Sequence, residues 1–302
     1  MFRLTTLLCT ILLVLSSCQK DLNYSDDNYQ AKLVVNAVFS PEDLWSIHLC
    51  RTNSIFENRD IDLSVTDAVI RVEDLSDNTE IQFEHKGDGH YRSIGFTPQP
   101  GHSYEIFVDS EKYGKVYSST YVPSVGEVSN INVETVQFKE QSVYKIDLEI
   151  TDLPFQDNYY VWQVVAETEE DRSLKIFAEN DISSIEDAIE ENAPLTFNPK
   201  TKGEMVFSET ETTSDSGGEQ FNTSIFAVPP QSSAQASEGN DVEFKIKLKL
   251  RAVSEDLFLH LKSLEELNLI NSSNNQPTVV YSNIQDGYGI FGAFTEEIIT
   301  IK

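Results

Sequence analysis

The sequence has few cations. Only 22 Lys+Arg stand against 50 Asp+Glu in 302 residues, so the formal net charge is -28 at pH 7. Such an acidic chain is not a general nucleic-acid binder, because binding to a polyanion depends on basic side chains that displace its counterions. It is equally unsuited to holding an extended face on anionic lipid headgroups. Apolar residues make up 39% of the chain, which is typical of a folded protein.

Cysteine is also scarce. The three cysteines are Cys9, Cys18 and Cys50. We expect Cys9 to leave with a signal peptide and Cys18 to carry lipid, so that Cys50 is the free thiol of the mature protein. This excludes a disulfide framework. Stability therefore has to come from burial of a core, which about 280 residues can supply.

An apolar run near the start of the chain is too short to span a bilayer. Arg3 precedes this run, which extends from Leu7 to Leu15 and is interrupted by Thr10. Roughly a dozen residues cannot cross ~30 Å of hydrocarbon, and this arrangement is typical of a secretory signal peptide. We predict that residues 1–17 are this signal peptide.

The residues behind the run indicate a lipid anchor. Leu15-Ser16-Ser17-Cys18 resembles the lipobox of bacterial lipoproteins, in which the cysteine is lipidated and becomes the new N-terminus. An ordinary signal peptide with a cysteine near its cleavage site is the alternative. Gln19, Lys20 and Asp21 resemble the export signal for the outer face of the outer membrane. We expect residues 18–32 to be a lipidated tether at the outer membrane, with the protein facing the cell exterior.

The mature chain is predicted to be mainly all-β. From Leu33 onward apolar and polar residues alternate, as they do in half-buried strands. Turn-forming clusters separate the candidate strands at intervals of about ten residues, which is typical of an immunoglobulin-like β-sandwich. We predict this sandwich over residues 33–123. Its predicted strands are 33–39, 45–50, 68–73, 80–85, 90–94, 103–108 and 115–122.

Residues 124–302 predict a second β-rich domain with small helical insertions. Strands are predicted at 128–136, 143–150, 159–166, 221–228 and 242–252. The last of these presents four cations on its polar face, which are Lys245, Lys247, Lys249 and Arg251. Helices are predicted near 183–191, after a capping box, and near 254–270, where leucines recur at helical spacing. Residues 209–241 are predicted to be a mobile loop region.

A glycine motif near the end of the chain matches the spacing of a dinucleotide-binding fingerprint but not its sequence context. Gly287-Tyr288-Gly289-Ile290-Phe291-Gly292 satisfies G-x-G-x-x-G. Too few residues follow for the crossover helix, the next strand and the acidic residue that would hold the ribose. Glycines in a β setting instead indicate bulges or a close approach of two backbones.

The histidines offer two further candidate sites. His85 and His90 flank a hairpin and could hold a metal together with Asp88, although two strand-end residues around a turn explain the same pattern. His48 and Cys50 share a strand face, where ordinary packing is the simpler interpretation.

Aromatic and acidic clusters leave further alternatives open. Phe155, Tyr159, Tyr160 and Trp162 could be a stacking platform for a ligand, but they fit a core equally well. The acidic segment 167–171 reads as a solvated loop, because it lacks the spacing of a calcium loop.

Motifs of nucleophilic hydrolases are missing. The chain has no G-x-S-x-G, S-x-x-K or H-E-x-x-H. A glycosidase pair could still lie among the many carboxylates. We therefore expect a protein that is not an enzyme, with no catalytic residue, metal or cofactor assigned.

Several segments together resemble a lipoprotein family of Bacteroidota, domain of unknown function 4249. Besides the lipobox, the resemblance rests on residues 33–36, 47–51, 65–72, 254–264 and 281–292. It implies an accessory protein of TonB-dependent outer-membrane transporters, and it supplies no catalytic residues. A surface hydrolase acting on glycan or peptide, and a structural adhesion module, are the alternatives. Because most excess acid lies in residues 124–302, we expect a solvated second domain whose partner is neutral or basic.

Overall fold

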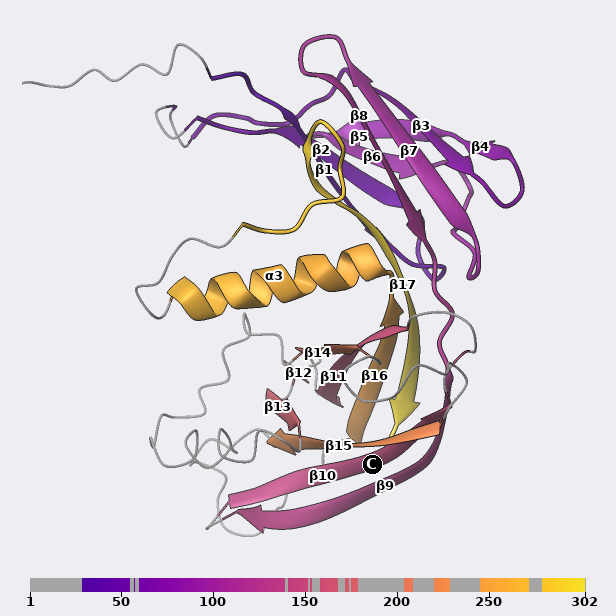
Figure 1. Cartoon of the computed structure of the whole chain (residues 1–302), viewed down its shortest axis with the longest axis vertical. Coiled ribbons are helices and arrows are strands. Elements are labelled where there is room, and N and C mark those ends of the chain that lie inside the picture. The colour runs from indigo at the N-terminus through magenta and orange to yellow at the C-terminus, as the bar shows by residue number, and fades with distance from the viewer. Residues whose placement is uncertain are drawn as a thin grey trace, which may run out of the picture. The chain divides into compact units, whose positions relative to one another are not determined.

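Strands dominate the computed structural model of the chain (Figure 1). The structure describes residues 29–54, 57, 60–138, 141–151, 153, 158–167, 172–173, 175–178, 204–208, 220–228, 245–271 and 279–301. The chain divides into one unit of Met1–Ala31 with Asn53–Asp62, and a second of Lys32–Thr52 with Leu63–Lys302. Within the first unit, the Ser54 amide donates to the Glu57 carboxylate at 3.3 Å.

Several predictions fall outside the described residues. They are the signal peptide 1–17, the lipidation site Cys18, the export signal of Gln19, Lys20 and Asp21, and the helix near 183–191. Most of the tether 18–32 and of the loop region 209–241 lies outside them as well. These stay predictions.

Two sheets form the predicted β-sandwich. The first carries, in spatial order, β1 (Leu33–Phe39), β2 (Ser46–Arg51), β6 (His90–Ser93) and β5 (Phe83–Gly87). The second carries β4 (Thr79–Ile81), β3 (Val69–Asp74), β7 (Ser103–Ser110) and β8 (Gly114–Tyr121). Neighbours in both are antiparallel. The all-β class and the sandwich are confirmed.

The single strand predicted over residues 80–85 is wrong, because the structure has two separate strands there. The strand expected over 80–85 ends at Ile81 and resumes at Phe83. Because β4 pairs with β3 and β5 pairs with β6, the chain changes sheets at Gln82. There the Gln82 carbonyl accepts a hydrogen bond from the Ile94 amide at 3.0 Å instead of joining a ladder.

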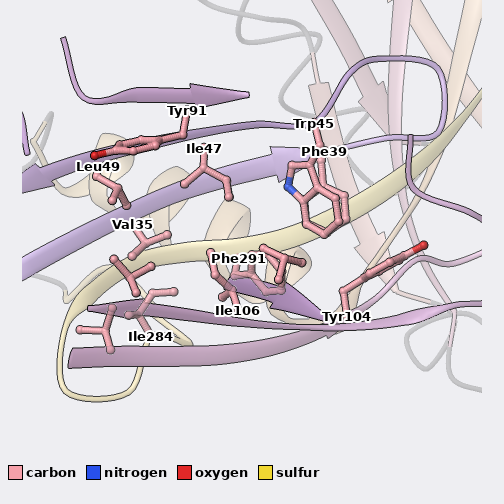
Figure 2. Packing of buried hydrophobic residues seen from close by; sticks show 14 of the residues in the cluster. Val35, Phe39, Trp45, Ile47, Leu49, Tyr91, Tyr104, Ile106, Ile284 and Phe291 are labelled. Atoms are coloured by element: carbon pink, nitrogen blue, oxygen red, sulfur yellow. The ribbon is translucent and has the colours of Figure 1, made fainter. Parts of the chain in front are cut away.

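The core of the sandwich is built from alternating side chains of both sheets (Figure 2). Trp45 precedes β2, Tyr104 lies on β7, and both are fully buried. Their rings meet edge to face with centroids 5.1 Å apart, while Phe291 stacks on Trp45 at 5.7 Å. Burial of each such side chain stabilises the fold by about 1.5–3 kcal/mol. The aromatic cluster therefore holds the two sheets together.

A long C-terminal strand extends the first sheet. β17 (Tyr288–Thr300) pairs in parallel with β1 through residues 288–293, and antiparallel with β16 (Lys245–Val253) through residues 294–300. β11 (Tyr159–Glu167) follows β16, and β12 (Arg172–Ser173) and β14 (Glu204–Ser208) both pair with β11. The result is a nine-stranded sheet, here called the long sheet. The domain boundary expected at residue 123 stays a prediction.

A third sheet encloses a second core against the long sheet. Its order is β13 (Lys175–Ala178), β15 (Gln220–Val228), β10 (Gln141–Thr151) and β9 (Glu127–Phe138). Buried positions of β10 and β15 pack with those of β11 and β16. The alternation that predicted these strands thus marks the sides that face this core.

The single described helix covers part of the long sheet. α3 (Glu255–Asn271) lies where a helix was expected over 254–270. The Ser254 hydroxyl caps it by accepting a hydrogen bond from the Leu257 amide at 3.4 Å. Leu257 and Phe258 pack against Val161, Val253 and Ile290. Among the described residues, no helix has both the length and the apolar character needed to cross a bilayer.

Candidate functional site

The outer face of β1, β2 and β6 carries side chains that do not pack in the core. Ser46 lies opposite Arg92 in the ladder, and His48 lies opposite both Asn36 and His90. Residues directly opposite each other in an antiparallel pair point to the same face. Ile47 and Leu49, which alternate with Ser46 and His48 along β2, are buried in the sandwich. The side chains of Ser46 and His48 therefore point away from its core.

Two adjoining hollows on this face share Ser46 and Arg92, and together we call them the Arg92 groove. The first has a volume of about 460 Å³, and the second has a volume of about 410 Å³. Val38, Phe39, Ser40, Asp43, Leu44 and Phe294 complete the first, and Lys86, His90 and Tyr91 complete the second.

The Arg92 groove combines an apolar rim with charges of both signs. Val38 and Leu44 are each 47% exposed. Lys86 is paired with Glu84, but neither Arg92 nor Asp43 forms an ion pair within the described part of the chain. A guanidinium without a partner can bind a carboxylate or phosphate through two parallel hydrogen bonds. The groove is therefore suited to an amphiphilic ligand that carries an anionic group.

Two imidazole rings stack at the edge of the groove. The centroids of His48 and His90 are 4.4 Å apart, and the ring planes differ by 21°. Burial and the neighbouring His90 lower the pKa of His48, although a hydrogen bond with the Asp88 backbone opposes them. His48 is thus neutral near pH 7 and can donate or accept a hydrogen bond.

The structure does not bring together His85, Asp88 and His90, the residues considered as possible metal ligands. The His85 ring packs against Tyr91 with centroids 4.9 Å apart, while His90 stacks on His48. A bulge between His85 and Gly87 shifts the register at this point of the hairpin. Within the described residues, the metal-ligand cluster of three side chains lies elsewhere.

The other histidine candidate, His48 with Cys50, is not an activated thiol. Cys50 is half-buried, and this burial raises the pKa of its thiol. A protonated thiol is a poor nucleophile and a poor metal ligand. The packing interpretation therefore fits Cys50 better than a reactive site does.

The cluster of three side chains that could each ligate a metal consists of Asp74, Asp77 and His102. Asp74 is 1% exposed, and its Oδ1 accepts hydrogen bonds from the amides of Ser76 and Asp77 at 2.9 and 3.2 Å. Its Oδ2 lies 2.8 Å from His102 Nδ1, while the Asp77 carboxylate lies 4.0 Å from the same nitrogen. Both Asp74 oxygens are thus used within the protein, so the arrangement is that of a structural acceptor.

Hydrogen bonds set the charge states of this cluster. Burial opposes ionisation of Asp74, but its hydrogen bonds with His102, Ser76 and Asp77 outweigh this and hold the carboxyl pKa below 3.8. The hydrogen bond with Asp74 raises the pKa of His102 above 6.5. Each residue of the pair therefore favours the charged form of the other.

The predicted aromatic cluster is core, and the platform alternative is wrong for its central members. Tyr160 and Trp162 are fully buried with the second core. Tyr159 lies on the opposite face, where its ring contacts Phe258 of α3 with centroids 4.8 Å apart. Phe155 lies outside the described residues, as does most of the acidic segment 167–171.

The glycine motif serves backbone packing, as expected. A Cβ on Gly289 would lie 2.0 Å from the Val35 carbonyl oxygen, and one on Gly292 would lie 2.9 Å from Leu257 Cβ. The motif thus lets β17 approach β1 on one side and α3 on the other. It is not a phosphate-binding loop.

The four cations of the predicted strand 242–252 lie on β16, and one of them, Arg251, contacts side chains of β17. Arg251 forms an ion pair with Glu296 at 2.7 Å, and its guanidinium stands 5.0 Å from the centre of the Phe294 ring. Arg251 therefore ties β16 to β17.

Sequence reasoning missed both the Arg92 groove and the cluster around Asp74. The groove joins side chains of β6, β17 and the turn after β1, which share no local motif. The cluster had a weak signal, since an Asp at a strand end before Ser76 and Asp77 is typical of a side-chain turn. Nothing in that signal pointed to His102.

Comparison with known proteins places the chain in a family. No curated protein matches it. The family model described as "Domain of unknown function (DUF4249)" matches residues 20–299. Since this match covers nearly the whole sequence, the chain belongs to the DUF4249 family.

Proposed function

We propose that the protein is a lipid-anchored lipoprotein of the outer membrane, exposed at the cell surface. In this proposal it is a non-catalytic accessory or ligand-binding partner of a TonB-dependent transporter in nutrient uptake. The sequence Leu15-Ser16-Ser17-Cys18 supports the anchor, and Gln19, Lys20 and Asp21 support the outward address.

The Arg92 groove is the observation that carries a binding role. It places the exposed apolar side chains of Val38 and Leu44 beside a guanidinium that makes no ion pair within the described residues. A concave surface with a few polar groups among apolar ones is typical of ligand and partner sites. A peptide segment or small molecule with both a carboxylate and an apolar part would satisfy both features.

The composition of the groove favours binding over hydrolysis. Glycoside hydrolysis requires a pair of carboxyl groups, and Asp43 is the carboxylate that lines the first hollow. Nucleophilic hydrolysis requires an activated hydroxyl or thiol. The serine hydroxyls of the groove belong to Ser40 and Ser46, and within the described residues neither is hydrogen-bonded to a histidine that could act as its base. These features support a non-catalytic role.

A lipid anchor at Cys18 would supply much of the effective affinity. Acyl chains bind the membrane at about 0.8 kcal/mol per buried CH₂. Confinement to the membrane plane raises the effective concentration of the protein around a membrane partner. A groove of modest intrinsic affinity would then be sufficient for a stable association with the transporter.

The proposal is tested by affinity purification of the full-length protein from cells that express it natively. We expect a TonB-dependent transporter to co-purify, and a combined R92Q and L44D variant to recover much less of it. A matched R71Q variant, which removes an exposed cation of β3 outside the groove, should behave as the unaltered protein. Repeated recovery of no transporter, or equal recovery with all three proteins, would reject the proposal.

A further inference from the structure

β9 leaves a long backbone edge without a partner strand among the described residues. It is the last strand of its sheet and pairs with β10 alone. It runs for 12 residues from Glu127 to Phe138. In an edge strand, about every second residue turns its N–H and C=O groups away from the neighbour, where they can pair with another strand.

The other edges of the described sheets are short or covered. β4 has 3 residues, β12 has 2, β13 has 4, and β5 and β14 each have 5. β8 is longer, but the Gln285 amide donates to its Tyr117 carbonyl at 2.9 Å, and its Ser118 hydroxyl donates to the Asn283 carbonyl at 3.0 Å. β9 is therefore the exception among these edges.

The sequence of β9 lacks the residues that normally block an edge. Proteins protect exposed edges with lysine, proline or inward-pointing charges. The strand EVSNINVETVQF contains no lysine, arginine or proline. Its charged side chains are those of Glu127 and Glu134, which would repel an acidic segment but not a basic one.

Packing holds β9 in place before any partner arrives, with extended backbone on both sides of a bulge at Asn130. Val128, Ile131 and Val133 pack against the second core. Asn130 has a φ of 50° beside the bulge opposite β10, and its side-chain amide donates to the Glu149 carboxylate at 3.1 Å. A preformed edge reduces the ordering cost of binding to that of the incoming segment.

Charge along this edge selects the occupant. Glu127 and Glu134 lie on β9 and Glu149 lies next to it on β10, and none of the three forms an ion pair within the described residues. Lys145 of β10 lies opposite Glu134, but its ammonium group pairs with Asp147 at 2.9 Å. A second copy of this acidic chain would bring further glutamates to the edge, whereas a basic segment would neutralise them.

We propose that β9 accepts an extended, basic segment of another protein as an added β-strand. Main-chain hydrogen bonds along the open edge supply affinity, and lysine or arginine at alternate positions contacts Glu127 and Glu134. This inference goes beyond the proposed function, since it requires neither the lipid anchor nor the Arg92 groove.

The test uses the full-length protein and a fluorescent peptide of about ten residues that alternates lysine with valine. We expect anisotropy to show saturable binding, and hydrogen exchange to show new protection of amides within residues 127–138. An analogue with glutamate in place of lysine, and one with alternate backbone nitrogens methylated, should each bind at least about tenfold more weakly.

A charge-reversal pair separates the edge from general electrostatic attraction. The combined E127K and E134K variant should lose binding of the lysine peptide, whereas the E42K and E111K variant, with the same change in net charge, should retain it. Equal loss in both variants, or equal binding of the methylated analogue, would overturn the proposal. Protection of β9 that depends on protein concentration without peptide would show self-association and overturn it as well. Hydrogen exchange on the unaltered protein decides the matter even if a variant fails to fold.

Discussion

The carboxylate of Asp74 lies 2.8 Å from Nδ1 of His102 and joins the end of β3 to the residue before β7. Asp74 is almost fully buried, and its other oxygen holds the turn that begins at Ser76. The pair therefore fixes one end of the second sandwich sheet through charge-assisted hydrogen bonds.

The stabilisation from this pair should depend on pH in both directions. The raised pKa of His102 contributes stability that is complete below pH 6.5 and is lost as the pH rises through the folded-state pKa. The lowered pKa of Asp74 contributes stability that is complete above pH 3.8 and is lost as the pH falls through its folded-state pKa. Denaturant unfolding should thus show the largest difference between the protein and a H102Q variant between pH 3.8 and 6.5. A difference that grows from pH 6.5 to 9 would contradict the assignment.

Removal of the buried carboxylate should be costly even where His102 is neutral. A D74A variant leaves two backbone amides and the imidazole without their acceptor, and we expect a loss of about 1–3 kcal/mol in the free energy of unfolding. The D77A variant is the matched control, because Asp77 is exposed and 4.0 Å from the ring. It should change stability by less than about 0.5 kcal/mol. Equal losses would show that Asp74 has no special role.

Two glycines with nearly identical φ angles should respond differently to alanine. Gly289 has a φ of 108° and Gly87 has a φ of 109°. A Cβ would meet the Val35 carbonyl oxygen at 2.0 Å in the first case and nothing within 4 Å in the second. We expect G87A to cost about 1–2 kcal/mol from conformational strain alone. G289A should add the cost of steric overlap, typically another 1–3 kcal/mol or so. Equal unfolding free energies would contradict the close packing of β17 on β1.

The fluorescence of the protein should report two buried indoles. The chain has two tryptophans, and both Trp45 and Trp162 are fully buried. We expect blue-shifted emission and weak quenching by acrylamide in the folded protein, with both lost on unfolding. Strong quenching in the native state would show that at least one of the two indoles is exposed. A W162A variant should lose about 3–5 kcal/mol, as a large core truncation does.

The lipid anchor makes a prediction of its own. A C18S variant lacks the thiol that would carry the lipid, so we expect the protein to leave the membrane fraction. Metabolic labelling with a fatty acid should mark the unaltered protein and not the variant. Labelled C18S protein would show that the lipid is attached elsewhere, and absence of label from the unaltered protein would show that the signal peptide is of the ordinary kind.

Alternation predicted most strands because each of them buries one face. β1 shows this clearly, since Leu33, Val35 and Ala37 are buried while Asn36 is exposed. β17 gave no such pattern, because Ile290 packs under α3 and Phe291 packs in the sandwich core. Its pairing with β1 joins segments about 250 residues apart, which no local pattern specifies.

The candidate sites were harder to predict than the fold. Arg92 and Asp43 belong to different segments of the chain. Arg92 lies opposite Ser46 because of the register in which β6 pairs with β2, and no local sequence pattern specifies that register. His102 reaches Asp74 because β3 pairs with β7, so the contact depends on tertiary structure. The aromatic cluster was ambiguous because the same alternating pattern fits a core and a binding platform.

Site-specific photo-crosslinking in intact cells tests the central claim most directly. A photoreactive residue replaces Leu44 at the rim of the Arg92 groove, and a control replaces Val69, which is 70% exposed on the second sandwich sheet. We expect mass spectrometry to identify a TonB-dependent outer-membrane transporter crosslinked to position 44 and not to position 69. Failure to crosslink any such transporter at position 44, with the protein shown to be folded and present at the membrane, would contradict it.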